Sequence, residues 1–108
     1  MQDSEMFKLK AELCKTFADA KRLAIIHELR SGERLVGELA QTLRVPHAVA
    51  SRHLALLRNR GVVRPRREGT NVYYSLTDPK IAAACDIIHE VFLNSLNKSR
   101  ELAERLTA

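Results

Sequence analysis

The chain has 108 residues, of which 45% are hydrophobic and 29% charged, and its formal net charge is +5 at pH 7. This length and composition predict a single folded domain over residues 1–108 and exclude a chain that is disordered throughout. No apolar run approaches the ~20 residues of a membrane-spanning helix and no apolar signal region opens the chain, so we expect a cytoplasmic protein outside the membrane.

Apolar residues at three- and four-residue steps predict a first amphipathic helix over roughly residues 4–17. Asp19 is a favourable N-cap for a second helix, which Ser31 and Gly32 should end. The apolar stripes are Met6, Leu9, Leu13 and Phe17 in the first helix and Leu23, Ile26 and Leu29 in the second, where they form the expected buried face. A third helix should carry Val36, Leu39, Ala40 and Leu43.

A fourth helix should begin near Pro46, whose missing N–H costs nothing in a first turn, and should end at Gly61. Its apolar face consists of Val45, Val49, Leu54, Leu56 and Leu57, while His47, Ser51, Arg52 and Arg58 fall largely off that face. Two strand-like runs follow, at residues 62–67 and 71–76. The turn-forming residues 68–70 between these runs predict a β-hairpin.

The positive charge of the chain is concentrated in the fourth helix and the hairpin. Residues 41–75 hold seven arginines and one acidic residue, whereas the remainder holds eleven basic and twelve acidic residues. This asymmetry indicates a polyanionic partner. A helix with a polar face followed by an arginine-rich hairpin is the plan of a winged helix-turn-helix, whose helix enters the major groove of double-stranded DNA.

Asp78 and Pro79 are expected to cap a last helix of about 30 residues. Its seam repeats at four- and three-residue steps and consists of Ile81, Cys85, Ile88, Phe92, Ser95, Ser99, Leu102 and Leu106. A domain of this size cannot cover so long an apolar seam by itself. We therefore expect the first and last helices to pack together in a two-fold homodimer, which places two recognition helices about one DNA turn apart.

Four segments resemble, in order, motifs of the ArsR/SmtB family of transcriptional repressors. Residues 17–26 resemble the family's Leu-Ala-Asp-Pro-Thr-Arg-Leu-x-Ile-Leu, residues 36–40 its Val-x-Glu-Leu-Ala, residues 50–57 its Val-Ser-x-His-Leu-x-x-Leu and residues 67–76 its wing. The resemblance covers about residues 12–81. It implies a mainly α dimer of the order α-α-α-α-β-β-α that represses transcription and leaves its operator when an inducer binds.

Carried over to this chain, the resemblance assigns DNA contact to His47, Ser51 and Arg52 on the fourth helix and to the wing. The chemistry agrees, because an arginine can donate two hydrogen bonds to guanine and several arginines can neutralise phosphates. The expected DNA-binding residues are His47, Ser51, Arg52, Arg58, Arg64, Arg66, Arg67, Thr70 and Asn71.

The metal sites of the family are expected to be absent. At the third-helix site, where the family needs paired cysteines, this chain has Leu35, Val36 and Gly37. At the last-helix site Asp78 fits, but Lys80, Val91 and Asn94 take the other positions and are poor zinc ligands. No metal or cofactor is therefore expected, and Asp78 is interpreted as an N-cap.

Cys14 and Cys85 are the candidate effector residues, because some members of the family sense persulfides or oxidants through paired cysteines. The resemblance is imperfect, since the more familiar pair uses a cysteine on the second helix. Three interpretations stay open: a thiol pair that releases DNA when linked, soft-metal or metalloid binding in which His89 assists Cys85, and inert packing with no thiol effector.

The sequence contains no arrangement typical of an enzyme, such as a Ser/His/Asp or Cys/His set, a phosphate-binding glycine loop or paired carboxylates. A winged-helix module that binds only other proteins is a remote alternative, since a fold alone does not dictate function. The concentration of arginine on the fourth helix and the hairpin favours DNA.

Overall fold

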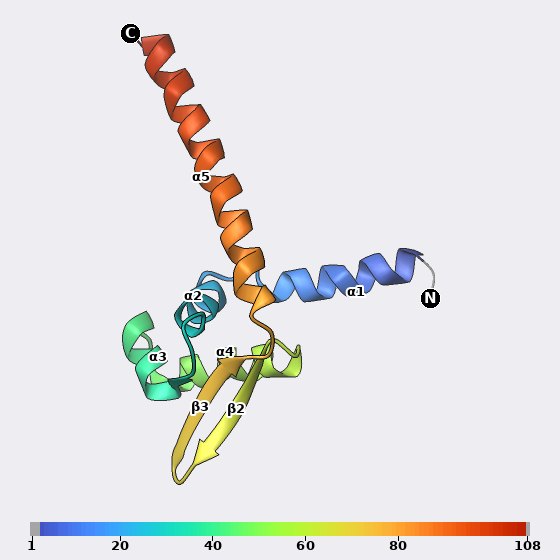
Figure 1. Ribbon diagram of the computed structural model, residues 1–108, viewed down its shortest axis with the longest axis vertical. Helices are drawn as coiled ribbons and strands as arrows, with labels where there is room; N and C mark the ends of the chain where they lie inside the picture. The colour runs from blue at the N-terminus through green and yellow to red at the C-terminus, as the bar shows by residue number, and fades with distance from the viewer. Residues whose placement is uncertain (1–2, 108) are drawn as a thin grey trace.

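The structure, a computed structural model, describes residues 3–107 and has five helices and three strands in that range. The elements are α1 (Asp3–Thr16), α2 (Ala20–Leu29), β1 (Arg34–Leu35), α3 (Val36–Leu43), α4 (His47–Asn59), β2 (Val63–Glu68), β3 (Asn71–Leu76) and α5 (Lys80–Thr107) (Figure 1). This confirms the predicted order of four helices, a hairpin and a long last helix. The short strand β1 was not expected.

The core lies where α2, α3 and α4 pack against one another and against the base of the sheet. Its buried side chains are Ile25, Ile26, Leu29, Val36, Leu39, Ala40, Ala50, Leu54, Leu57, Val62 and Val63. The prediction that Leu23 belongs to this core is wrong, because 44% of its surface is exposed and Ile25 takes the buried position. Leu23 instead lines a groove between α1, α2 and α5.

The sheet has the order β1-β3-β2, and both of its pairings are antiparallel. Strands β2 and β3 form the wing and are joined through Gly69, whose φ of 61° lies in the left-handed region that favours glycine. Side chains alternate between the two faces of the sheet, so Val63 turns into the core while the arginine after it stays exposed. Beyond its base the wing projects away from the helices (Figure 1).

Asp19 caps α2, as predicted. Its Oδ1 accepts hydrogen bonds from the backbone N–H groups of Lys21, at 2.8 Å, and Arg22, at 3.2 Å. The bond from the Arg22 amide is the main reason why the pKa of Asp19 lies below its ordinary value of 3.8. The cap therefore depends on the ionised carboxylate.

Replacing Asp19 with alanine is expected to lower the free energy of unfolding by about 1 kcal/mol at pH 7. The carboxylate contribution is complete above the ordinary pKa and is lost as the pH falls through the lowered folded value. Asp19→Asn should keep most of the stability at pH 7 but lose this acid dependence. Urea unfolding at pH 7 and pH 3, at one protein concentration, measures both effects. An Asp19→Ala variant as stable as the parent at pH 7 would contradict the role of the cap.

Helices α1 and α5 extend away from the body of the molecule and diverge from each other (Figure 1). The radius of gyration is 17.3 Å, whereas a compact domain of this length has about 13 Å. The 28 residues of α5 reach about 42 Å, and none of them is buried. In a single chain the two helices approach each other only at their bases (Figure 1), and their packing in a homodimer stays a prediction.

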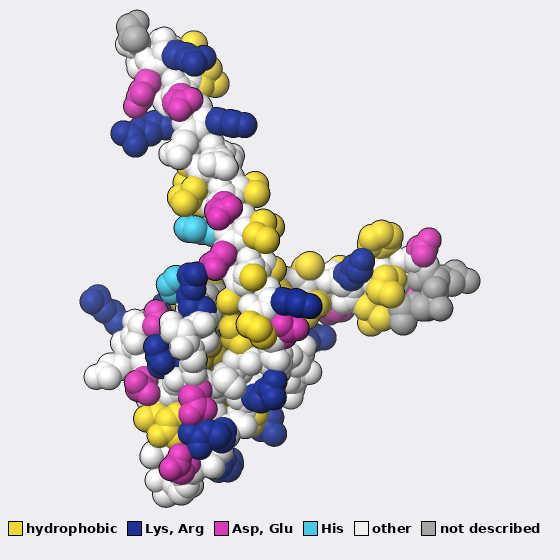
Figure 2. Space-filling view, viewed as in Figure 1, with side chains coloured by type: hydrophobic (Ala, Val, Ile, Leu, Met, Phe, Trp, Pro, Cys, Tyr) yellow, Lys and Arg dark blue, Asp and Glu magenta, His cyan; other side chains and the backbone are white. Residues whose placement is uncertain are grey.

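Hydrophobic side chains gather along α1 and α5 and where these helices meet the body (Figure 2). The exposed large ones on these two helices are Met6, Phe7, Leu9, Leu13, Ile87, Ile88, Val91, Phe92, Leu93, Leu96, Leu102 and Leu106. We call this set the arm surface. Within residues 3–107 no helix is both long and apolar enough to cross a membrane. An exposed apolar surface of this extent is typical of a protein interface.

Candidate nucleic-acid interface

The fourth helix presents a polar face opposite its buried one. Ala50, Leu54 and Leu57 are buried, and Arg52 is exposed on the opposite side, whereas His47 shares their side of the helix by its spacing and is exposed because it is the first residue of α4. Pro46 is the N-cap residue and lies just before the helix rather than in its first turn. His47 Nδ1 lies 3.4 Å from Ser51 Oγ, so these two polar side chains form one group near the start of α4.

A cleft of about 660 Å³ lies between β1 and α3 on one side and the tip of the wing on the other, with the first residue of α4 at its border. His47 from the helix, Thr70 from the turn and Asn71 from β3 all line it. The structure thus brings His47 to the neighbouring residues Thr70 and Asn71, which lie far from it in the sequence and were also predicted to bind DNA. Gln41, on α3, lines the same cleft and was not predicted, because nothing in its local sequence distinguishes it from any other exposed glutamine.

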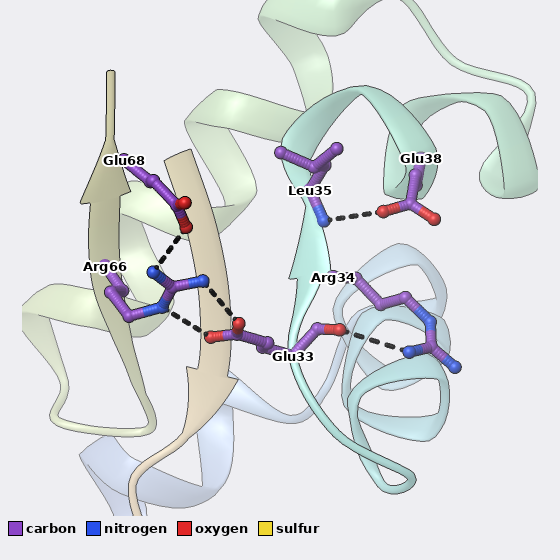
Figure 3. A network of polar contacts seen from close by, with 6 residues as sticks. All are labelled: Glu33, Arg34, Leu35, Glu38, Arg66 and Glu68. Atoms are coloured by element: carbon purple, nitrogen blue, oxygen red, sulfur yellow. Dashed lines mark hydrogen bonds and ion pairs between the residues drawn. The ribbon is translucent and has the colours of Figure 1, made fainter. Parts of the chain in front are cut away.

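The three predicted wing arginines differ in their surroundings. Arg64 donates a hydrogen bond of 2.8 Å to the carbonyl of Thr77. Arg66 is paired with two glutamates (Figure 3). The side chain of Arg67 is exposed and has no hydrogen bond or ion pair to any residue between 3 and 107. Phosphate contact by all three remains a prediction, but Arg67 is the one without a competing partner in the described part of the chain.

The two cysteines line one apolar groove of about 880 Å³ between the end of α1, α2 and the start of α5. Both thiols are free, and Cys14 is exposed whereas Cys85 is half-buried against the core. Burial is the main cause of a raised pKa of the Cys85 thiol, and the carboxylate of Asp86 adds to it. Cys85 is therefore less readily ionised than an ordinary thiol.

An ion pair beside this groove ties α5 to α2. Arg30 Nη2 donates to Asp86 Oδ2 at 2.7 Å, and Arg30 Nη1 lies 3.3 Å from His27 Nδ1. In addition, Asp78 Oδ1 accepts a hydrogen bond of 2.9 Å from the Lys80 N–H and so caps α5, as predicted. The described residues include no group of three or more His, Cys, Asp or Glu side chains placed to hold a metal ion.

A family model described as "Bacterial regulatory protein, arsR family" matches residues 19–64, from the N-cap of α2 into β2. HlyU of Vibrio cholerae, described as a transcriptional activator, is 34% identical over 93 residues. The match covers 85% of this chain and 86% of HlyU.

Two solved structures are similar over most of the chain. The crystal structure of Rv0081 from Mycobacterium tuberculosis has a TM-score of 0.80 and 35% identity, and covers 86% of this chain and 94% of that one. The solution structure of a fragment of Mb0332 from Mycobacterium bovis has a TM-score of 0.78 and 30% identity, covering 89% and 91%. Mb0332 is described as a homodimeric winged helix-turn-helix DNA-binding domain and a possible ArsR-family regulator.

Proposed function

Since this chain belongs to the ArsR family of winged helix-turn-helix DNA-binding transcriptional regulators, we propose that it is a homodimeric repressor that releases its operator when Cys14 and Cys85 are linked. The observation that carries the proposal is that both thiols line one groove at the base of α1 and α5, the two helices that we call the arms. On the DNA side, the proposal draws support from the cleft between the polar start of α4 and the wing tip.

The homodimer is proposed because the arm surface has no cover in a single chain. Phe7 of α1 is 67% exposed and Ile88 of α5 is also 67% exposed, which is costly for such side chains in water. A second copy related by a two-fold axis would cover both helices at once and would pair two recognition helices. The relative Mb0332 is homodimeric, which supports this assembly.

A thiol switch is proposed because of where the groove lies. Cys14 belongs to the last turns of α1 and Cys85 to the first turns of α5, so a covalent link between them constrains both arms. The arms would set the spacing of the two recognition helices in the dimer. A constraint at their base therefore changes how well both helices fit one operator.

Hydrogen peroxide can serve as the oxidant that links Cys14 to Cys85. The exposed Cys14 thiol loses its proton, the thiolate attacks one oxygen of the peroxide and the O–O bond breaks. The departing hydroxide takes up that proton, so the products are a sulfenic acid and one water. The Cys85 thiol then loses its proton and attacks the Cys14 sulfur, so that the S–S bond forms and the S–O bond breaks. The departing hydroxide takes up this proton as a second water. Two thiols are oxidised and one peroxide is reduced to two waters.

Peroxide treatment of the reduced dimer is expected to weaken operator binding roughly 5- to 150-fold, the usual range of allosteric coupling. Cys85→Ser and Cys14→Ser should each bind like the reduced parent and lose the response. Fluorescence anisotropy on the operator, with mass spectrometry for the loss of two hydrogens across both cysteines, measures this. Full linkage with unchanged affinity, or an intact response in Cys85→Ser, would eliminate the thiol switch.

Repression is tested separately with a reporter placed behind the operator. Loss of the regulator should raise reporter expression, and peroxide should do the same only when both cysteines are present. A fall in expression on losing the regulator would identify an activator, the activity by which the relative HlyU is described.

A further inference from the structure

Arg66 of the wing is held by acidic groups from two different parts of the chain. Its Nε and Nη2 donate to the two carboxylate oxygens of Glu33 at 3.0 and 2.6 Å. Its Nη1 donates to Glu68 Oε2 at 2.9 Å. All three guanidinium nitrogens thus have protein acceptors, and Figure 3 shows the guanidinium between the two carboxylates.

The contact with Glu33 connects the wing to the body of the molecule. Glu33 lies in the segment between α2 and β1, at one edge of the sheet, whereas Arg66 belongs to β2, at the other edge. Between them lies β3, on which Tyr73 is the cross-strand partner of Arg66. The Arg66 guanidinium carbon is 4.5 Å from the centre of the Tyr73 ring, an arrangement favourable to a cation. The Arg66 side chain therefore reaches from β2 past β3 to the segment just before β1.

The positive charge of Arg66 is already more than neutralised by its two glutamate partners. By donating hydrogen bonds, Arg66 holds the pKa of Glu33 below its ordinary value, and Glu33 and Glu68 together raise the pKa of Arg66. Two carboxylates against one guanidinium leave this group with a net negative charge, which is unfavourable for a phosphate. A bidentate arginine–carboxylate pair also has a defined geometry that a lone surface charge lacks.

Arg67, the next residue of β2, lies on the other face of the strand, away from Glu33. Arg67 pairs with Val72, and side-chain alternation turns it to the face opposite Arg66. Val72 lines the cleft that also contains His47, the first residue of the fourth helix. Arg67 therefore lies on the side of the wing that borders the start of the recognition helix.

We propose that Arg66 is a positioning residue that fixes the wing to the body through Glu33, and that Arg67 is the arginine by which this part of the wing binds DNA phosphate. The inference rests on the DNA-binding function and is independent of the cysteines. Glu33 thereby acquires a role in DNA binding although it is acidic. The wing tip is exposed on both strands, so few other contacts hold it. The Arg66–Glu33 contact therefore limits the movement of the wing relative to the body.

Lysine replacements separate the two roles, because lysine neutralises a phosphate but cannot form the two-pronged contact with a carboxylate. Arg66→Lys is expected to weaken operator binding by the dimer about three- to tenfold, with the salt dependence unchanged. Arg67→Lys should bind within about twofold of the parent. Arg67→Ala should reduce the magnitude of the slope of log affinity against log salt concentration by roughly two, one for each protomer of the dimer.

The two glutamates form a matched pair of controls. Glu33→Gln should weaken binding although it removes a negative charge beside DNA, whereas Glu68→Gln should not, because Glu68 lies on the same strand as Arg66. Hydrogen exchange in the free protein should become faster at residues 66–73 in Arg66→Lys and Glu33→Gln, and the double variant should add little.

The proposal is overturned if Glu33→Gln strengthens binding, or if Arg66→Lys binds like the parent while Arg66→Ala flattens the salt plot. Either result would make Arg66 a phosphate contact. Arg52→Ala shows whether the DNA-binding function itself is at fault. If alanine at position 52 and alanine at both wing positions all leave operator binding unchanged, the premise that α4 and the wing bind DNA fails, and the roles of Arg66 and Arg67 are not what was tested.

Discussion

Phe92→Glu is expected to break the homodimer and to weaken operator binding at least about a hundredfold. Phe92 lies on the arm surface and is 58% exposed in a single chain, so it is available for an interface. A buried, unpaired carboxylate in the apolar seam would cost several kcal/mol. Separating the two protomers then removes the gain from binding two half-sites at once, which is typically 10²- to 10⁴-fold.

Asn97→Glu is the matched control for this change. It adds the same charge to the same helix, but residue 97 lies about 140° around the helix from residue 92. Sedimentation equilibrium measures the association of the chains, and anisotropy with an operator duplex measures DNA binding. The dimer model fails if Phe92→Glu still sediments as a dimer and binds the operator normally, or if Asn97→Glu is equally damaging.

Arg52→Ala is expected to weaken binding to the operator by about 1–3 kcal/mol for each recognition helix, and to weaken binding to random DNA much less. Arg52 is exposed on α4, opposite the buried Ala50, Leu54 and Leu57. From this position the guanidinium can donate two hydrogen bonds to a guanine edge in the major groove. The loss would fall on sequence-specific binding because a random site does not offer that guanine at the right place.

Titrations of operator and random duplexes at several salt concentrations measure this specificity. Arg100→Ala removes the same charge from α5, where the side chain is exposed and paired only with Glu104 within the described residues, and should leave both affinities nearly unchanged. An equal loss on the two duplexes in Arg52→Ala would show that the side chain contacts phosphate and reads no base.

The order of the helices and the hairpin could be predicted from the sequence because each depends on local rules. Leu54 and Leu57 recur at helical spacing, Asp19 offers a carboxylate at the right place for an N-cap, and Gly69 permits the tight turn of the wing. A last helix too long for its own core was also evident from spacing. The charge asymmetry, which depends only on where the charged residues stand in the sequence, indicated a nucleic acid before any contact was known.

Contacts between segments were decided only by the tertiary structure. Strand β1 has two residues, too few for a pattern, and exists because β3 offers it an edge. Spacing placed Leu23 on the buried face, but the packing of α2 against its neighbours turned Ile25 inward instead. The missed strand and the misplaced Leu23 share one cause. Periodicity indicates which residues share a face of an element but not which other element packs against that face.

The same distinction separates the arginines of the wing. By sequence Arg66 and Arg67 are equivalent cations on one strand, and both were predicted to bind DNA. The fold brings Glu33 from the other edge of the sheet to 2.6 Å from Arg66, whereas Arg67 is exposed on the opposite face of β2. Composition and local spacing thus determined that this protein has a basic helix and wing, while long-range packing decided which of its charges are neutralised and which remain for a partner. The physical reason is that a charge acts over a few ångströms, and only the folded chain sets those distances.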